Sequence, residues 1–565
     1  MDLKWVLRDD VDQNLINTLA SELNTPKSIA RILCNRKIYD VESAHRYFRF
    51  QIGDLYDPFL LADMQKAVDR IILALRNREK ILIYGDYDVD GITSVSLVYL
   101  LLKYLGCNVE FYIPNRLREG YGMSIDGIKV AQLKGVSLII TVDCGITAIE
   151  EVQFAKKAGI DIIISDHHES GTELPNALAV LNPKANGENY PFRELAGVGV
   201  AYKLLLALIR MLKLDEEIIH QYVDLVAIGS AADIVPIVDE NRILVREGLR
   251  KLNEKNKPGL AALLETSGLR NKVISTGQIV FVLAPRINAV GRMGNAERAV
   301  RLLTTSNKQQ AKNIAAILEA ENRERKNIDD LTFKEAQEIV DNEYDLQETA
   351  ALVLDMDGWH PGVIGIVASR IVEKYYRPTV MISVEDGIGK GSARSIHGFD
   401  VYEALKKCED LMLGFGGHKY AAGLTIEEKK IQPLRERLNE IARETLTDDM
   451  LIPKLNIDCE IGLDEISPRF VQMLKMIAPY GPQNLRPVLL SQNLQVVGTP
   501  SVVGKNHLKF KVQQNGVVID AIGFNLGDKI YRLTPGEKNL DLAYVVEENE
   551  YMGRTTLQLR IKDLR

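Results

Sequence analysis

The stretch Ile81-Leu82-Ile83-Tyr84-Gly85-Asp86-Tyr87-Asp88-Val89-Asp90-Gly91 decides the fold class of this chain. Its first four residues are apolar or aromatic and two of them are β-branched, which is typical of a short buried strand. Three aspartates at a spacing of two follow, and then a glycine. The stretch therefore predicts a β-strand that ends in a cluster of carboxylates.

Three further strand-like runs follow it, at residues 109–113, 138–142 and 161–165. Helical patterns at residues 94–105, 125–133 and 148–158 separate the runs. Apolar strands that alternate with helices predict an α/β fold with a parallel sheet covered on both faces. Such sheets bind ligands beyond the carboxyl ends of their strands, where the acidic clusters at 86–90, 143 and 166–168 are expected to meet.

The composition is that of a globular protein with several domains. The 565 residues suffice for three or four domains, and the net charge is −7. With that charge, a nucleic-acid enzyme needs its positive charge concentrated in a groove. Five cysteines without a CxxC pair argue against a disulfide framework and fit a reducing compartment. No signal peptide or membrane span is expected, so we predict a cytoplasmic protein with no membrane partner.

Four predicted parts follow one another along the chain. Residues 1–240 hold the catalytic α/β domain with a helical start, and residues 241–345 form a helical connector. Residues 346–448 form a second α/β domain, and residues 449–565 form a strand-rich barrel. Residues 309–344 contain neither proline nor glycine, so they predict one long helix of roughly 50 Å.

One strand of the predicted barrel has a basic face. Lys505, His507, Lys509 and Lys511 alternate with apolar residues, and a period of two places the basic side chains together. Barrels that bind single-stranded nucleic acid have this character.

Six aspartates and two histidines in four clusters indicate a site for divalent metal ions. They are Asp86, Asp88, Asp90, Asp143, Asp166, His167, His168 and Asp233. Carboxylates are hard oxygen ligands, and neutral imidazole suits Mn²⁺, Zn²⁺ or Fe²⁺. Asp233 lies in a strongly apolar run, where a buried carboxylate needs a metal or a cationic partner. Two ions that share a carboxylate are suited to phosphodiester hydrolysis.

Each cluster taken alone has a simpler interpretation. The first cluster matches the start of an EF-hand loop, but the loop's last acidic position is Leu97 and a strand precedes it. A solvated acidic turn remains an alternative for that cluster, as does an exposed polar loop for Asp166-His167-His168. Asp143 alone is compatible with a helix cap.

Together the clusters resemble the DHH phosphoesterase superfamily and, within it, the RecJ family of bacterial exonucleases. The motifs stand in the family's order, at residues 86–91, 142–145, 166–168 and 232–233. The second α/β domain resembles the DHHA1 domain through residues 358–370, 391–395 and 414–418, and residues 285–292 are also similar to the family. The last part resembles the family's oligonucleotide-binding barrel.

The resemblance implies a role for each matched residue. The implied ligands of Mn²⁺ or Mg²⁺, with two ions per site, are Asp88, Asp90, Asp143, His167 and Asp233. His168 and Asp86 are implied as catalytic residues, with His168 facing the scissile phosphate and Asp86 in support. Tyr84 stands where many superfamily members have a histidine, and tyrosine is a poor ligand near neutral pH.

The resemblance also implies substrate contacts. They are Arg370, Ser392, Arg394 and His418, with Lys505 and Lys509 of the barrel. Arg286 and Arg292 either line the cleft or pair with acidic side chains.

The implied fold is a DHH domain with a parallel sheet, a long connecting helix, a DHHA1 domain and an OB-like barrel. The implied activity is a 5′→3′ exonuclease specific for single-stranded DNA, acting in repair and recombination as a monomer. A single-strand-binding protein or a helicase is an implied partner. The alternatives are a phosphodiesterase acting on short oligoribonucleotides or cyclic dinucleotides, and a non-catalytic scaffold that binds nucleic acid.

Overall fold

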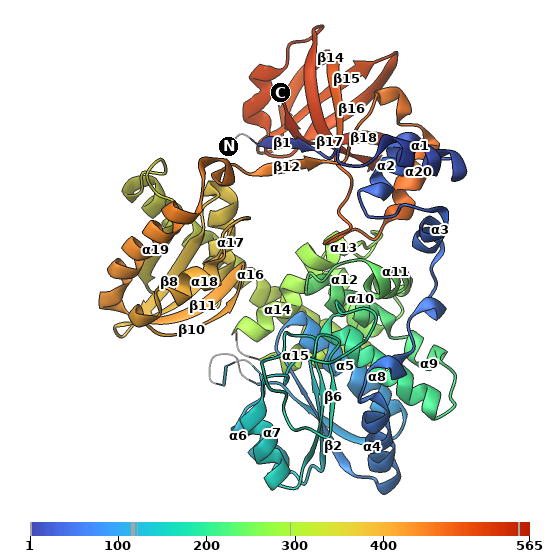
Figure 1. Ribbon diagram of the computed structural model, residues 1–565, viewed down its shortest axis with the longest axis vertical. Helices are drawn as coiled ribbons and strands as arrows, with labels where there is room; N and C mark the ends of the chain where they lie inside the picture. Colours follow the sequence, from blue (N-terminus) through green and yellow to red (C-terminus); the bar gives the residue numbers. More distant parts are fainter. Residues whose placement is uncertain (1–2, 115–118, 121, 294, 552–553) are drawn as a thin grey trace.

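The computed structural model describes residues 3–114, 119–120, 122–293, 295–551 and 554–565. Three bodies are visible in Figure 1: a blue and green α/β body, a yellow and orange α/β domain, and a red barrel. This arrangement confirms the predicted fold class.

The first body is built on a five-stranded sheet in the order β3-β2-β4-β5-β6, and all its pairings are parallel. The strands are β2 (Lys80–Gly85), β3 (Asn108–Tyr112), β4 (Leu138–Val142), β5 (Asp161–Ser165) and β6 (Ala179–Leu181). The first four agree with the predicted runs to within a residue. All five end at the same edge because they are parallel, so that edge collects the residues that follow them.

Alternate side chains of these strands enter two different cores. Ile81 and Ile83 pack with α4 (Met64–Asn77), α5 (Val89–Tyr104) and α8 (Gly197–Met211). Leu82 and Tyr84 face the opposite way, onto α6 (Ile125–Leu133) and α7 (Ile149–Lys157). Both faces are therefore buried, which explains why the strands are almost continuously apolar.

A helical region completes this body. Its helices are α9 (Glu217–His220), α10 (Val223–Ala232), α11 (Asp239–Glu254), α12 (Pro258–Thr266), α13 (Thr276–Gln278), the π-helical turn Ile279–Leu283, α14 (Ala284–Met293) and α15 (Glu297–Thr304). Most of them share one hydrophobic core with the sheet.

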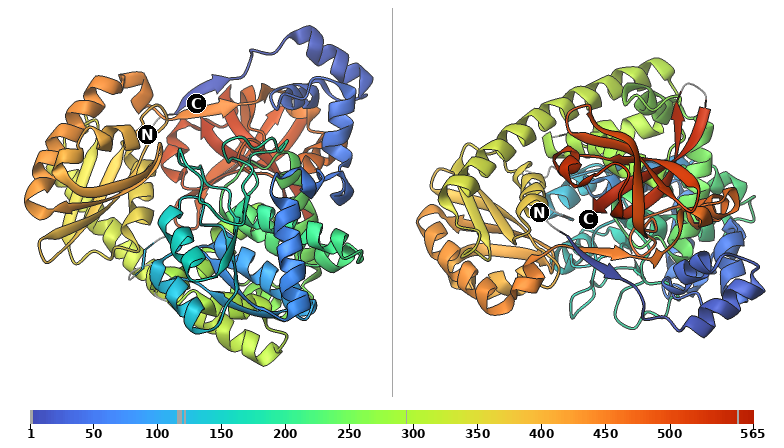
Figure 2. Two further views of the ribbon diagram at one scale, coloured as in Figure 1. Left: turned by 60° about the horizontal axis from the view of Figure 1, so that its bottom comes forward. Right: turned by 90° about the horizontal axis from the view of Figure 1, so that it is seen from above.

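The helix α16 (Lys308–Glu343) connects the first body to the second α/β domain, as the right view of Figure 2 shows. Its 36 residues confirm the predicted long helix. Arg325 and Asp329 are buried, and α16 packs against α17 (Ile364–Tyr375), whose Arg370 pairs with Asp329.

The second α/β domain has a mixed sheet in the order β10-β11-β9-β8-β7. Its strands are β7 (Leu352–Asp357), β8 (Thr379–Glu385), β9 (Ile388–Arg394), β10 (Met412–His418) and β11 (Ala421–Glu427). Its other helices are α18 (Val401–Lys406) and α19 (Ile431–Thr445).

The C-terminal part contains a closed barrel of five strands. They are β14 (Leu489–Val503), β15 (His507–Gln514), β16 (Val517–Gly523), β17 (Lys538–Tyr551) and β18 (Arg554–Leu564), and the pairing of β14 with β17 closes the barrel. The short strands β12 (Lys454–Ile457) and β13 (Cys459–Glu460) and the helix α20 (Pro468–Ile477) precede it.

The beginning of the chain differs from the sequence prediction in one respect. We expected only helices before residue 80, but β1 (Lys4–Leu7) forms a parallel pair with β12 (Figure 1). The helices α1 (Gln13–Glu22) and α2 (Lys27–Cys34) and part of α3 (Val41–Arg49) share a hydrophobic core with the barrel, not with the parallel sheet. The limits at residues 240, 345 and 448 stay a prediction.

None of the helices within the described residues is both long enough and apolar enough to cross a membrane.

A buried ion pair joins α8 to α11. The Lys203 ammonium lies 2.6 Å from a carboxylate oxygen of Glu240, and both side chains are fully buried. We expect Lys203→Met to lower the free energy of unfolding of this body by about 3–5 kcal/mol, because the Glu240 charge stays buried without its partner. Urea denaturation measures the loss.

The control is Lys251→Met, which breaks a partly exposed pair with Glu217. We expect it to cost at most about 1 kcal/mol. Equal losses in the two variants would show that burial of the pair is not what makes Lys203 important.

Candidate metal centre

The turn between β2 and α5 places three aspartates at the sheet edge. Asp88 is the N-cap of α5, and its carboxylate accepts the amide hydrogen of Gly91 at 3.0 Å. Asp90 lies in the first helical turn, and Asp86 is buried at the end of the strand. Carboxylates are stabilised at a helix N-terminus by the amide groups that have no partner within the helix.

Asp90 also binds the N-terminus of a second helix. Its carboxylate accepts hydrogen bonds from the amides of Gly197 and Val198, the first residues of α8, at 2.7 and 2.9 Å. A Cβ at Gly197 would lie 2.5 Å from a carboxylate oxygen of Asp143, so α8 approaches this closely only with glycine there. One buried carboxylate thus ties together the two helices that cover the sheet edge.

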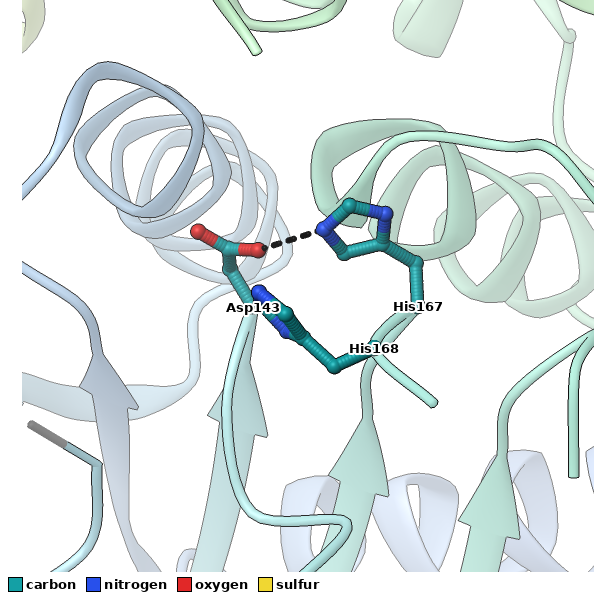
Figure 3. Close-up of side chains that lie close together, drawn as sticks. All are labelled: Asp143, His167 and His168. Atoms are coloured by element: carbon teal, nitrogen blue, oxygen red, sulfur yellow. Dashed lines mark ion pairs between the residues drawn. The ribbon is translucent and has the colours of Figure 1, made fainter. Parts of the chain in front are cut away.

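Asp143 follows β4 directly. Its amide donates to the Ser165 carbonyl at 2.9 Å, and its φ of +60° turns the chain out of the sheet. Aspartate tolerates this left-handed conformation better than most residues. The turn sends the carboxylate toward His167, as Figure 3 shows.

Asp166 orients the two histidines that follow it. Its carboxylate accepts hydrogen bonds from the amides of Ile146, His167 and His168, and Nδ1 of His168 lies 2.8 Å from it. Although burial opposes it, the bond with His168 lowers the pKa of Asp166. The same contact outweighs burial at His168 and raises its pKa to about 9.

His167 lies among three carboxylates. Its Nε2 is 3.2 Å from Asp143, 3.6 Å from Asp233 and 3.9 Å from Asp90. Two ligands that are each about 2.1 Å from one ion, at right angles to one another, are about 3 Å apart. Burial and the nearby His168 lower the pKa of His167 to about 3, so the ring is neutral, which is the form that binds metals.

Asp233 reaches the cluster from a helix rather than a strand. It is the C-cap of α10, and its amide donates to the Gly229 carbonyl at 2.9 Å. A Cβ at Gly229 would lie 2.8 Å from Asp90, so α10 packs directly against the start of α5.

Among the residues that the structure describes, three sets have ligand atoms that lie within 4.8 Å of one another. The sets are Asp90, His167 and Asp233; Asp143, His167 and His168; and Asp86, Asp88 and Asp143. Asp143 and His167 each belong to two sets, so the donor atoms form one continuous cluster. Every implied metal ligand from the sequence is in it, together with Asp86 and His168.

The electrostatics of the cluster fit a divalent cation. Burial and the negative charge of neighbouring aspartates raise the pKa of Asp143, of Asp233 and of Asp90. A cation among them would remove this cost, because an opposite charge favours the ionised carboxylates. Several carboxylates with one neutral imidazole suit Mn²⁺, and the carboxylates suit Mg²⁺.

Tyr84 is not part of the cluster. Its side chain points into the core on the α6 side of the sheet, and its hydroxyl accepts the Ser124 amide hydrogen at 3.1 Å. Burial raises the pKa of Tyr84 well above its ordinary value. The tyrosine therefore holds the start of α6 and offers no ligand atom to a metal.

Two of the predicted substrate contacts line a cleft in the second α/β domain. Ser392 and Arg394 lie on β9 beside a cleft of about 390 Å³, together with Gly416 and Gly417 of β10. The guanidinium of Arg394 donates to the Ser392 hydroxyl at 3.1 Å. His418, at the end of β10, is exposed. Small residues around an arginine suit a phosphate.

The other predicted arginines make contacts within the protein. Arg286 lies 2.5 Å from Glu319 of α16, which is the second of its two alternatives. Arg370 lies within 3 Å of Asp329 and Asp330, and its guanidinium covers the Phe333 ring. The side chain of Arg292 lies outside the described residues. The substrate roles of all three stay predictions.

The barrel residues have the predicted alternation. Leu508, Phe510 and Val512 are buried, and Lys509 and Lys511 between them are exposed. Lys505 is exposed in the turn before β15.

The resemblance to the family assigns no ligand or catalytic role to Asp166. Its position immediately before two histidines was the available signal, since metal-binding histidines are commonly oriented by a carboxylate. The amides of Gly197 and Val198 gave no signal, because main-chain donors are not visible in a sequence.

Three family models match consecutive parts of the chain. The DHH family N-terminal domain covers residues 80–230, the DHHA1 domain covers residues 348–444, and the RecJ OB domain covers residues 457–563. Except for Asp233, which follows it by three residues, the metal cluster lies inside the first match, at the edge of the sheet. The fold and the cluster together define a protein of the DHH class, with a DHHA1 domain and a terminal barrel.

Known proteins resemble the chain over almost all of its length. The single-stranded-DNA-specific exonuclease RecJ of Bacillus subtilis is 40% identical over 99% of this chain and 70% of its own. RecJ of Thermus thermophilus solved with Mn²⁺ is 27% identical with a TM-score of 0.84, covering 100% of this chain and 79% of its own. The same protein solved with Mg²⁺ is 26% identical with a TM-score of 0.79, covering 100% and 78%. The chain belongs to the RecJ family.

We expect Asp166→Asn to weaken Mn²⁺ binding by about 10- to 100-fold, because an amide cannot accept hydrogen bonds from all four of the donors around it. Isothermal titration with Mn²⁺ measures the change.

The control is Asp161→Asn, which changes an aspartate at the other end of the same strand, paired with Arg70. It should leave the affinity unchanged. Unaltered affinity in Asp166→Asn would show that Asp166 does not orient the histidines.

Proposed function

We propose that this chain is a metal-dependent exonuclease that degrades single-stranded DNA in the 5′→3′ direction and releases mononucleotides. The observation that carries the proposal is the continuous cluster of five aspartates and two histidines at the edge of the parallel sheet. Membership of the RecJ family supports it, because the relatives named above are single-stranded-DNA-specific exonucleases.

We further propose that the cluster holds two ions, Mn²⁺ or Mg²⁺. Asp143 is shared between a set with Asp86 and Asp88 and a set with His167 and His168, and His167 links the second set to Asp90 and Asp233. Bound there, the ions supply the Lewis acidity toward water and phosphate that phosphodiester hydrolysis needs. The structures of Thermus thermophilus RecJ in complex with Mn²⁺ and with Mg²⁺ support this choice of metals.

The protein's own residues orient the substrate in this proposal. His168 is held by Asp166 through Nδ1, so its Nε2 is the nitrogen that faces the scissile phosphate. The phosphate next to the scissile one is held in the cleft of the second α/β domain by Ser392, Arg394 and His418. Lys505 and Lys509 bind the strand further along, on the barrel.

The cellular setting is part of the same proposal. A DNA exonuclease of this kind acts in the cytoplasm, in repair and recombination, and we propose that it works as a monomer. A single-strand-binding protein or a helicase that exposes single strands is the partner that this substrate suggests.

The activity is tested with oligonucleotides labelled at either end, in single-stranded and blunt duplex form. We expect labelled mononucleotide to appear first from the 5′-labelled single strand with Mn²⁺ or Mg²⁺, and none with a chelator. Asp143→Ala, which removes the shared carboxylate, should be inactive.

Each other result contradicts a named part of the proposal. Release first from the 3′ end contradicts the polarity, and equal attack on duplex contradicts the strand specificity. Cleavage of di- to pentanucleotides alone favours the oligoribonucleotide alternative. Full activity in Asp143→Ala would exclude this cluster as the catalytic site.

We expect the double variant Lys505→Ala/Lys509→Ala to bind single-stranded DNA more weakly, with a weaker dependence on salt. Each phosphate contact contributes about 0.7 to the slope of log K against log salt, so the slope should fall by about 1.4. Fluorescence anisotropy in a chelator measures it.

Lys511→Ala is the control, because Lys511 lies on the same strand but 3.7 Å from Asp520. An unchanged slope in the double variant would show that this face of the barrel does not hold phosphates.

A further inference from the structure

Arg242 is a buried arginine that binds two distant parts of the chain. It lies near the start of α11 and is 2% exposed. Its guanidinium donates to the Tyr47 carbonyl of α3, and to the carbonyls of Met476, Ile477 and Ala478 at 3.0 to 3.2 Å. The last three carbonyls are at the C-terminal end of α20. This helix and the barrel that follows it are called the barrel module below.

The partners of the guanidinium are dipoles and rings. It stacks 3.7 Å from the centre of the Tyr47 ring and 4.5 Å from that of Phe50. The last carbonyls of a helix lack partners within it and form its negative end, so a buried cation there satisfies them. The buried guanidinium of Arg242 thus joins the first body, which carries the metal cluster, to the barrel module.

The loop that follows α20 docks onto the same body at two further places. The Ile237 amide donates to the Pro482 carbonyl at 2.9 Å, and the Thr276 hydroxyl donates to the Tyr480 carbonyl at 2.6 Å. A Cβ at Gly481 would lie 2.3 Å from Cγ1 of Ile237, so the loop is in close contact with that side chain. Residues 478–482 are called the docking loop below.

Ile237 ends the segment that begins with the metal-cluster residue Asp233. Ile234, directly after Asp233, has a φ of +63°, and the residue is 62% exposed. A β-branched residue with positive φ is strained, and such strain persists only where the surrounding contacts impose it. The docking loop holds the far end of this segment.

The neighbour of Arg242 holds the same segment from the other side. The Asn241 side chain is fully buried and donates to the Pro236 carbonyl at 3.0 Å and to the Glu194 carbonyl at 2.5 Å. Glu194 lies just before the amides of α8 that bind Asp90. The first turn of α11 therefore contacts, through adjacent side chains, the docking loop and both segments that position the metal cluster.

We propose that Arg242 is a positioning residue for the metal centre. By holding the docking loop against Ile237, it fixes the strained segment 233–237 and hence the carboxylate of Asp233. The proposal rests on the metal site of the proposed function. It makes the barrel module a structural part of the catalytic site as well as a surface for DNA.

A purely structural role for Arg242 predicts something different. Loss of the arginine would then lower the thermal stability and leave the metal affinity of the folded protein unchanged. The two roles are separated by measuring Mn²⁺ binding and DNA binding on the folded, full-length protein.

The experiment compares Arg242→Gln and Arg242→Lys with the unchanged protein. Free Mn²⁺ is measured by electron paramagnetic resonance during titration, and binding of single-stranded DNA is measured in a chelator. We expect Arg242→Gln to weaken the Mn²⁺ affinity by about 10-fold, as the loss of a residue that orients ligands does. DNA binding should stay within about twofold, and added Mn²⁺ should restore nuclease activity. Arg242→Lys, which keeps the charge but has fewer donors, should fall between the two.

The matched control is Arg246→Gln. Arg246 lies one turn along α11, covers the Phe50 ring at 4.8 Å and donates to the Phe48 carbonyl, but it is exposed, and the contacts described for it do not include α20. Its Mn²⁺ affinity should be unchanged. Equal affinity in Arg242→Gln and the unchanged protein would overturn the positioning role, whereas no Mn²⁺ binding in the unchanged protein would overturn the proposed function itself.

A second variant decides the matter if the Arg242 variants do not fold. Gly481→Ala keeps Arg242 and inserts a methyl group between the docking loop and Ile237. We expect it to weaken Mn²⁺ binding in the same way. Full affinity in a folded Gly481→Ala would overturn the proposal.

Discussion

Like charges gathered in a buried place repel one another, and this repulsion is the constraint on which the rest of the structure depends. Asp86, Asp90 and Asp143 are almost fully buried at one edge of a sheet. Main-chain amides hold the carboxylate of Asp90, and helix α8 packs closely against Asp143. The start of α8 binds Asp90, and Gly197 lets that helix reach Asp143. Such a site is rigid, and it is most stable with divalent cations in it.

The rigidity comes from a second layer of contacts that has no part in the chemistry. Asp166 contacts three nitrogens of the two histidines and also accepts the Ile146 amide hydrogen. Glu240, Asn241 and Arg242 anchor α8, the segment after Asp233 and the barrel module. These polar groups are buried and make most of their hydrogen bonds within the protein, whereas Oδ1 of Asn241 and Nε of Arg242 have no hydrogen-bond partner among the described residues. Buried hydrogen bonds of this kind fix the relative position of the segments that carry the metal ligands.

The sequence was most informative about local structure, which periodicity and composition predict. The strands of the parallel sheet and the alternation in β15 follow from the pattern of apolar residues, because each strand buries its apolar side chains in a regular way. The long helix follows from a stretch without proline or glycine. Tyr84 shows the limit of a motif. The resemblance places Tyr84 where many superfamily members have a histidine. The pleat of β2 instead directs its side chain into the core on the α6 side of the sheet. The acidic partners of Arg286 and Arg370 on α16 are also decided by the fold, since they are distant in the sequence.

The sequence by itself determined the kind of chemistry in this protein: carboxylates and imidazoles at the ends of parallel strands, whose positions are set by local hydrogen bonding and hydrophobic period. Tertiary structure alone decided how those groups combine. It brought Asp233 from the end of a helix, joined the N-terminal helices to the barrel, and docked the loop after α20 onto the segment that carries Asp233. The physical reason is that these contacts depend on shape and on main-chain donors and acceptors. Every residue has those groups, and so no sequence pattern marks them.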